Sequence, residues 1–274
     1  MSPSVSDFLK FLYGLFYPGD GSEGVGYSAI NTARSAVSTI ASLEGAPAGQ
    51  HKDVCQFMKA VFQSRPALPR YSKFWDPDVV LDYIKGLGRN KELSVKVLSQ
   101  KLVVLMVLQS GQRLQTLHSF DVRYMEFDVG VVTFRIMELL KTSRPGSHVS
   151  EVSFHVYELD RRLCVVSSVK AYLRRTLDDR GTVKQLFLTS RAPFRAAARA
   201  TLGRWMKSML LAAGVDKCFG PGSGRGASLS KLTLKGVSEE SIIKMIGWSN
   251  SSVFGKYYNK PLVQGQCFVR EFMD

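Results

Sequence analysis

The chain has 274 residues, of which 45% are hydrophobic and 22% are charged, so it can form about two folded domains and is not a disordered tail. Its 37 Lys and Arg against 23 Asp and Glu give a net charge of +14, which favours a polyanionic partner and nucleic acid in particular. No stretch is long and apolar enough to span a membrane, and the four scattered cysteines lack metal-ligand spacing, so we expect no membrane, no metal and reduced thiols in an intracellular protein.

The N-terminal part predicts a small helical bundle followed by a domain boundary. Apolar residues recur at helical spacing in three stretches: residues 4–17, 28–43 and 52–63. Arg34 lies opposite the apolar face of the second helix. Pro66 and Pro69 then interrupt the pattern, because proline disfavours helix at its own position and at the residue before it. We expect two domains, 1–68 and 69–274; the alternative is one helical domain with a surface loop.

The rest of the chain mixes helices with a few strands. Asp76-Pro77 is a typical helix start, and helices are predicted over residues 79–87 and 95–108. The apolar period then changes to two, which predicts three short antiparallel strands at residues 125–127, 131–136 and 149–154. A helix over 165–177, a strand over 185–188 and a helix over 201–213 follow. The predicted fold is therefore mostly α with a small antiparallel β-sheet.

Six arginines are the candidate DNA-binding residues outside any catalytic centre. Arginine side chains can neutralise DNA phosphates, and each such contact adds to the salt dependence of binding. A solvated, purely structural helix face is the alternative interpretation of such a run. The candidates are Arg34, Arg144, Arg191, Arg195, Arg199 and Arg204.

The C-terminal stretch from Gly222 to Lys260 carries most of the motifs. A glycine-rich segment containing Arg225 leads into a helix expected from Ser228 to Gly236. A second helix, capped by Ser238, ends at Gly247. Trp248 follows at once, and the adjacent Tyr257 and Tyr258 come nine and ten residues later. A phosphate-binding glycine loop at 221–226 is the weaker interpretation, since the flanking strand and the Lys-Ser/Thr of a P-loop are missing.

This order of Arg, Trp and Tyr resembles the C-terminal end of the tyrosine recombinases. The likeness extends to the recombinases of animal DIRS-like retroelements, whose Gly-Val-Ser turn, Gly-Trp-Ser turn and Phe-Tyr-Asn-Lys-Pro ending correspond here to 236–238, 247–249 and 257–261. Upstream, the segment 110–117 resembles the box around the first catalytic arginine of that family, and Arg113 is the matching residue. Thr116 stands where the family usually has Glu, and Lys141 takes the place of the lysine at the tip of the sheet. The resemblance covers about residues 5–264.

The resemblance implies a helical core-binding domain that clamps double-stranded DNA together with an α+β catalytic domain. It implies DNA cleavage and rejoining through a covalent 3'-phosphotyrosine, without cofactor or metal, by a self-assembled tetramer in the nucleus. In these roles Arg113 and Arg225 would hold the phosphate, Lys141 would supply a proton and Trp248 a hydrogen bond.

Tyr258 is the preferred nucleophile, and Tyr257 is the alternative. Tyr258 matches the tyrosine of the Phe-Tyr-Asn-Lys-Pro ending, whereas the spacing of Tyr257 from Trp248 is the one common in bacterial and phage relatives. Adjacent helical residues point about 100° apart, so only one of the two can face the phosphate.

Gly222 is the main departure from the family pattern. The family usually has histidine three residues before its second arginine, and the four histidines of this chain, at positions 51, 118, 148 and 155, all lie elsewhere. Three functions therefore stay open. They are an active recombinase, a catalytically impaired or domesticated DNA-binding descendant, and an unrelated helical nucleic-acid-binding protein.

Overall fold

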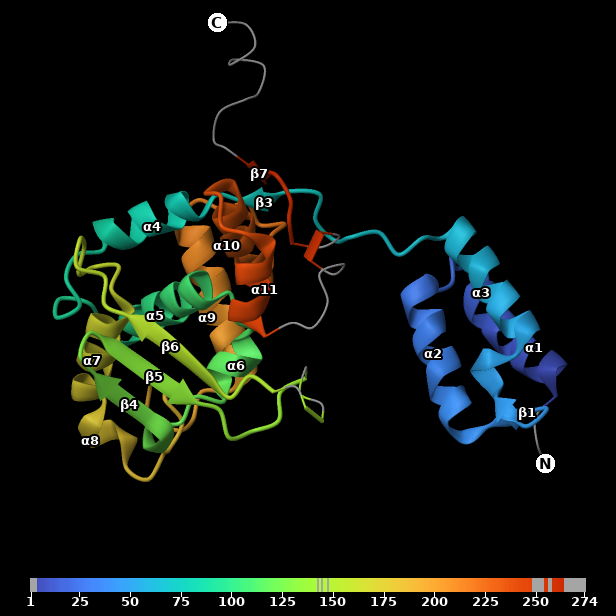
Figure 1. Cartoon of the computed structure of the whole chain (residues 1–274), viewed down its shortest axis with the longest axis horizontal. Helices are drawn as coiled ribbons and strands as arrows, with labels where there is room; N and C mark the ends of the chain where they lie inside the picture. The colour runs from blue at the N-terminus through green and yellow to red at the C-terminus, as the bar shows by residue number, and fades with distance from the viewer. Residues whose placement is uncertain are drawn as a thin grey trace, which may run out of the picture. The chain divides into compact units, whose positions relative to one another are not determined.

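The computed structural model describes residues 4–141, 143, 145–146, 148–247, 254–255 and 258–263. The chain divides into two compact units, Met1–Arg70 (unit 1) and Tyr71–Asp274 (unit 2) (Figure 1). Each unit has a hydrophobic core of its own. The mostly helical fold with a small antiparallel sheet that the sequence predicts is confirmed.

Unit 1 is a helical bundle closed by a short turn. Its elements are α1 (Val5–Phe16), α2 (Tyr27–Ile40), β1 (Ser42–Leu43), β2 (Ala46–Pro47), η1 (Ala48–Gln50) and α3 (Lys52–Ser64). Ser4 and Asp7 form a capping box at the start of α1, which satisfies two backbone N–H groups that the helix cannot. Phe8, Leu12 and Ile30 are buried together with residues of α3. Helix α2 ends three residues earlier than the sequence predicts, because the β1–β2 turn takes up the residues after it.

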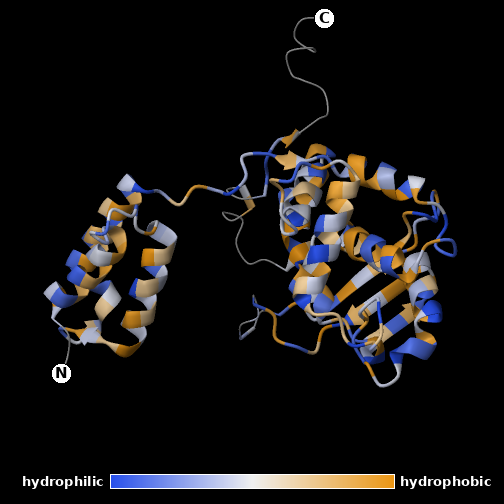
Figure 2. Ribbon diagram, turned by 180° about the vertical axis from the view of Figure 1, so that it is seen from behind, coloured by the Kyte–Doolittle hydropathy of each residue, from blue (hydrophilic) through white to orange (hydrophobic). Residues whose placement is uncertain are grey.

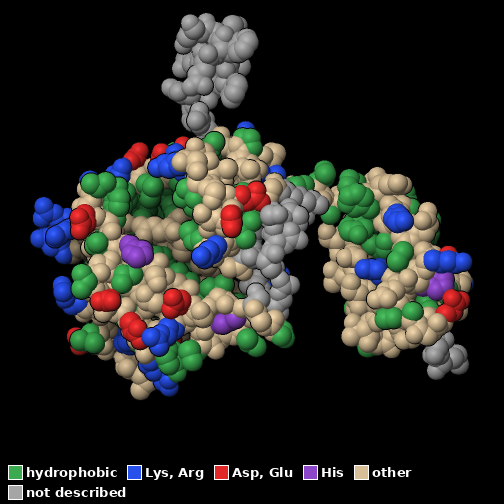
Figure 3. All heavy atoms as spheres, in the orientation of Figure 1, with side chains coloured by type: hydrophobic (Ala, Val, Ile, Leu, Met, Phe, Trp, Pro, Cys, Tyr) green, Lys and Arg blue, Asp and Glu red, His purple; other side chains and the backbone are tan. Residues whose placement is uncertain are grey.

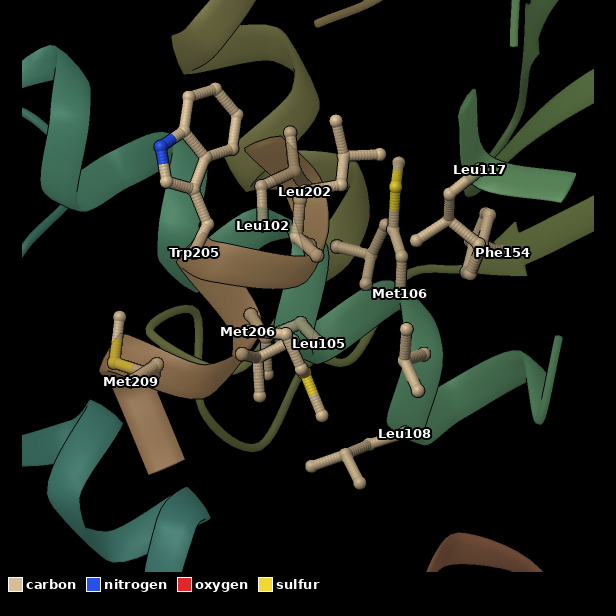
Figure 4. Close-up of a cluster of buried hydrophobic side chains, with 14 of the residues drawn as sticks. Leu102, Leu105, Met106, Leu108, Leu117, Phe154, Leu202, Trp205, Met206 and Met209 are labelled. Atoms are coloured by element: carbon tan, nitrogen blue, oxygen red, sulfur yellow. The ribbon is translucent and has the colours of Figure 1, made fainter. Parts of the chain in front are cut away.

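Unit 2 is built around α5 (Val95–Ser110). This helix is apolar on almost every side and is buried along most of its length, as expected for a helix enclosed by other elements. It packs against α7 (Val165–Arg175), α9 (Arg199–Ala212) and α10 (Ser223–Leu234). Figure 4 shows leucine and methionine side chains of α5 interleaved with Leu202, Trp205 and Met206 of α9.

A three-stranded antiparallel sheet covers another side of α5. Its order is β4 (Met125–Asp128), β5 (Val131–Arg135) and β6 (Glu151–His155). Side chains alternate between the core and solvent along β5 and β6. The ribbon coloured by hydropathy shows apolar and polar residues together on the strands of this sheet (Figure 2). Phe134 stacks on Phe120 with ring centroids 4.3 Å apart.

The strand predicted at 185–188 is wrong. That segment forms only two isolated bridges, Asp121 with Gln185 and Leu188 with Ala196. The segment is apolar because Leu186, Phe187 and Leu188 are buried in the core. A short apolar run of this kind can be a buried irregular segment as well as a strand, so the sequence pattern does not distinguish the two.

The remaining elements frame this core. They are β3 (Phe74–Trp75), α4 (Pro77–Gly86), α6 (Leu114–His118), η2 (Val122–Tyr124), α8 (Leu177–Arg180), α11 (Glu239–Ile246) and β7 (Leu262–Val263). Strand β7 pairs in parallel with β3, placing Leu262 beside Phe74. The chain just after residue 258 is therefore fixed against the start of unit 2.

The surface of unit 2 is hollowed beside β6. A cavity of about 570 Å³ is lined by side chains of α4, the end of α5, β6 and α10, and hydrophobic atoms show in the hollow in Figure 3. None of the described helices is long and apolar enough to cross a membrane.

Candidate functional site

Helix α10 begins at Ser223, five residues before the sequence-predicted start, so Arg225 lies inside its first turn. The flanking glycines allow this helix to pack very closely. A Cβ atom on Gly226 would lie 2.1 Å from the Phe74 ring, and one on Gly224 would lie 2.4 Å from the Met206 methyl carbon. The glycine-loop interpretation is ruled out because residues 223–226 are helical and the glycines serve packing.

This close packing buries Arg225, whose guanidinium lies beside the Tyr258 ring and feels the positive charge of Arg113. Arg225 is only 4% exposed, and its guanidinium carbon lies 5.5 Å from the centre of the Tyr258 ring, within cation–π range. Burial, and then the positive charge of Arg113, lower the pKa of Arg225 to about 10, while Tyr258 acts in the opposite direction. The protein therefore holds two guanidinium groups close together at an electrostatic cost.

Arg113 is positioned by the end of α5. Gly111 ends that helix in the left-handed conformation, with φ 60°. A Cβ atom there would lie 2.9 Å from Leu229 and 3.2 Å from Ile246, so the glycine lets α5, α10 and α11 meet at this point. Arg113 is then the N-cap residue of α6, half-buried, with Thr116 buried one turn later.

Hydrogen bonds of its backbone N–H and carbonyl groups fix the position of Tyr258. Its N–H donates to the carbonyl of Phe254 over 2.9 Å, and Phe254 is buried in a small cluster with Leu229, Ile242 and Ile246. The hydroxyl of Ser230 on α10 donates to the Tyr258 carbonyl over 2.5 Å and accepts the Lys260 N–H over 3.2 Å. No sequence pattern predicted a role for Ser230, because a serine inside an amphipathic helix carries no signal for a partner 28 residues away.

Lys141 is exposed in the connector between β5 and β6, at residues 136–150. Ser143 closes its turn by accepting the Leu140 N–H over 2.9 Å, and Ser143 in turn is hydrogen-bonded to His148 over 2.7 Å. The structure thus brings Arg113, Arg225 and Tyr258 together. Among the residues described, Lys141 has no hydrogen bond or ion pair with any of those three.

The connector also packs on the end of α11. A Cβ atom on Gly247 would lie 2.4 Å from a methyl carbon of Val149. A cavity of about 440 Å³ beside this contact is lined by residues of both segments, among them His148, Glu151 and Lys244. Trp248, Tyr257 and Arg144, which the sequence also singles out, lie outside the described residues.

Gly222 is the N-cap residue of α10 and leaves space at its position. Its backbone, at φ −72° and ψ −14°, suits any residue, and a Cβ atom would have no heavy atom of another segment within 4 Å. A histidine side chain can begin here without a steric clash.

The other candidate arginines differ in their surroundings. Arg191, Arg195, Arg199 and Arg204 are exposed on α9 and the loop before it, and α9 packs against α6, the helix that Arg113 begins. Arg34 in unit 1 is half-buried instead: it donates to the Gly49 carbonyl over 2.6 Å and to the Asn31 side chain over 3.0 Å. At least two of its donor groups therefore hold unit 1 together.

Within the described ranges, no group of three His, Cys, Asp or Glu side chains could hold a metal ion. The assembled residues have the chemistry to bind an anion. Two planar cationic forks and one phenol lie together in a basic protein.

No protein-family model and no curated protein matches the sequence. Solved structures do match it. The Tn1549 transposon integrase in complex with transposon right end DNA is 15% identical, with a TM-score of 0.59 over 99% of this chain and 85% of that one. The lambda integrase (75-356) dimer bound to a COC' core site is 14% identical, with a TM-score of 0.52 over 97% and 82%. XerA recombinase is 12% identical, with a TM-score of 0.51 over 98% and 81%. The chain therefore has the fold of the tyrosine recombinases.

Proposed function

We propose that the protein is a DNA tyrosine recombinase that cuts and rejoins DNA strands through a covalent 3'-phosphotyrosine intermediate. The observation that carries the proposal is the buried Arg225 beside both Arg113 and Tyr258. These residues come from three separate parts of the chain, and their proximity supports a shared phosphate site. A phosphodiester bound there would lie within reach of a nucleophile and of two cationic donors.

The electrostatics favour a phosphate as the bound group. Burial and mutual repulsion destabilise the charge of Arg225, and a bound anion would relieve both effects. Guanidinium groups match the non-bridging oxygens of a phosphodiester in geometry and can donate two parallel hydrogen bonds. Donors held in place before the reaction also stabilise the charge that develops on phosphorus oxygens in the transition state.

The reaction exchanges one phosphodiester for another and needs no added energy source. Tyr258 Oη passes its proton to a water molecule and bonds to phosphorus, the bond from phosphorus to the 5' oxygen breaks, and Lys141 Nζ gives that oxygen a proton. The reverse attack by a 5' hydroxyl group restores DNA and frees the phenol. Gly222 has no side chain to accept the phenolic proton, so we expect slower cleavage than a histidine at this position would allow.

Double-stranded DNA as the partner is supported by the surface next to the site. Helix α9 begins without a side-chain cap, with Arg199 in its first turn and Arg195 just before it. Positive side chains oppose the helix dipole at this end, so they gain stability when a phosphate binds there. Several structural neighbours were solved on DNA, including a lambda integrase tetramer bound to a Holliday junction.

The finer assignment rests on the motifs at 236–238, 247–249 and 257–261. They support an integrating enzyme of a DIRS-like retroelement that acts in the nucleus and assembles as four copies on DNA. Light scattering of the protein on a four-way junction tests the assembly, and a fluorescent fusion tests the location. A single copy per junction, or a fusion excluded from the nucleus, would contradict the respective assignment.

A nicked suicide substrate tests the main proposal. Loss of the short fragment after cleavage should trap a protein–DNA adduct that resists denaturant in the wild-type protein and in Tyr257→Phe, but not in Tyr258→Phe. Peptide mapping of the adduct identifies the linked tyrosine. Intact DNA binding without any adduct would exclude the enzyme, and an adduct on Tyr257 would move the nucleophile by one residue.

The second candidate is a DNA-binding descendant that no longer cleaves, and the observation that favours it is the empty side-chain position at Gly222. The open space around this residue makes Gly222→His a clean test. Gain of adduct in Gly222→His from an inactive wild type would show an impaired recombinase. No adduct in either form, together with retained DNA affinity, would support a binding protein.

A further inference from the structure

We infer that Ser230 is a positioning residue for Tyr258, an inference that rests on the proposed function. Its hydroxyl is buried, with the residue 1% exposed, and makes two hydrogen bonds. It donates its one proton to the Tyr258 carbonyl and accepts the Lys260 N–H. A hydroxyl group has one proton to donate, so this arrangement uses the proton and one acceptor position.

The two bonds fix the chain on the C-terminal side of the Tyr258 side chain. The Phe254 carbonyl accepts the N–H of Tyr258 itself, on the N-terminal side of that side chain, over 2.9 Å, and also the N–H of Asn259 over 3.0 Å. The Phe254 side chain is fully buried. The backbone that carries the phenol is therefore held from both directions, and Ser230 supplies one of the two attachments.

Ser230 is part of helix α10, and the same helix also carries Arg225. Arg225 and Ser230 are five positions apart in the helix, which is a fixed rise of about 7.5 Å along its axis. One rigid element thus sets both the guanidinium that would bind the phosphate and the backbone of the tyrosine that would attack it. Side chains supported by helices hold geometry more closely than those supported by loops alone.

The test compares Ser230→Ala with Ser168→Ala, a matched control on α7. Ser168 is also fully buried, also donates to a backbone carbonyl, that of Cys164, and also accepts one N–H, from Asn90. It lies outside the proposed site. Both variants lose the same kind of buried hydroxyl group, so they share any general loss of stability.

With the full chain and the nicked DNA substrate, we expect Ser230→Ala to slow single-turnover adduct formation by ~10- to 100-fold relative to Ser168→Ala, with DNA affinity unchanged. Ser230→Thr, which keeps the hydroxyl group, should recover most of the rate. Equal rates in the two alanine variants would overturn the positioning role.

Hydrogen exchange gives a second measurement that needs no activity. The Tyr258 and Asn259 amides should exchange faster in Ser230→Ala but not in Ser168→Ala, because the segment loses one of its attachments. Unchanged exchange would contradict the inference. If the wild-type protein forms no adduct at all, the proposed function fails, and the exchange result alone still decides whether Ser230 positions Tyr258.

Discussion

At the scale of single residues, the structure holds two positive charges where a neutral core would be more stable. Arg225 is kept beside Arg113, and Lys101 is buried in the middle of α5 with its amine lacking a hydrogen-bond partner among the described residues. The first fits an anion site. The buried amine of Lys101 lies outside that site, and it makes the folding stability depend on pH.

Arg225→Lys keeps the charge and removes the planar fork. We expect adduct formation to fall by ~10²-fold or more, because a lysine ammonium cannot hold two phosphate oxygens in the same plane. Arg135→Lys, an exposed residue of β5, is the control and should cleave at the wild-type rate. A wild-type rate in Arg225→Lys would mean that point charge alone is sufficient at this position.

Lys101→Met tests the cost of the buried amine. Burial lowers the pKa of Lys101 from 10.5 to about 8, so between these values the unfolded chain binds more protons than the folded one. Wild-type stability should therefore rise as pH increases from about 8 to 10.5, and this rise should be missing in the variant. Below pH 8 the variant should be more stable by up to about 3 kcal/mol.

Urea unfolding at a series of pH values measures this effect. Lys96→Met, exposed on the same helix, controls for the loss of one charge. A variant less stable than the wild type at pH 7 would show that the amine has a partner that stabilises it.

At the scale of elements, tertiary packing makes the start of α10 helical although its glycines have a low helix propensity. Glycine costs about 1 kcal/mol relative to alanine inside a helix, so the segment 222–226 predicts a loop. Contact of Gly224 with Met206 and of Gly226 with Phe74 outweighs that cost, and the helix starts at Ser223. These contacts come from residues 74 and 206, which local sequence patterns cannot reveal.

Gly226→Ala should destabilise unit 2 by ~1–3 kcal/mol, since its methyl group would overlap the Phe74 ring, which is itself buried. Gly86→Ala is the matched control. Gly86 is the last residue of α4, has an ordinary helical environment and has open space where the methyl group would go. That variant should be as stable as the wild type or slightly more stable. Equal unfolding midpoints for both variants in urea would refute the packing argument.

Most helices and strands could be predicted because their apolar residues recur at a regular spacing over several turns or strand positions. Helices α1, α3 and α5 and the three strands of the sheet lie within a few residues of their predicted bounds. Strands β3 and β7, of two residues each, could not be predicted, because their pairing joins chain segments almost 190 residues apart. The sequence motifs named Arg113, Arg225 and Tyr258, but their meeting, and the support from Ser230, depend on tertiary packing. Their chemical roles stay predictions.

At the scale of the whole molecule, we expect the net positive charge to determine the affinity for DNA. Nearly all of the net charge of +14 lies in unit 2, because residues 1–70 carry six Lys and Arg against five Asp and Glu. The exposed arginines of α9 extend the basic surface of unit 2 away from Arg113. Association should therefore be driven by release of the counterions condensed on DNA.

Affinity for duplex DNA should fall steeply with salt. For six to ten phosphate contacts we expect a loss of about 10³- to 10⁵-fold between 50 and 200 mM salt. Arg195→Ala should lower the slope of log affinity against log salt by about one, if its side chain neutralises one phosphate. Fluorescence anisotropy measures both, and an unchanged slope would remove Arg195 from the DNA surface.

The parallel pairing of β3 with β7 has a topological consequence. It brings the entry of unit 2, at Phe74, beside its last described strand, at Leu262, so the polypeptide of this unit is nearly a closed ring. A circular permutant could join these two points with a short linker and open the ring at an exposed turn such as Gly130. In such a molecule the backbone around Tyr258 would be continuous with Trp75, whose indole already donates to Ser223 on α10.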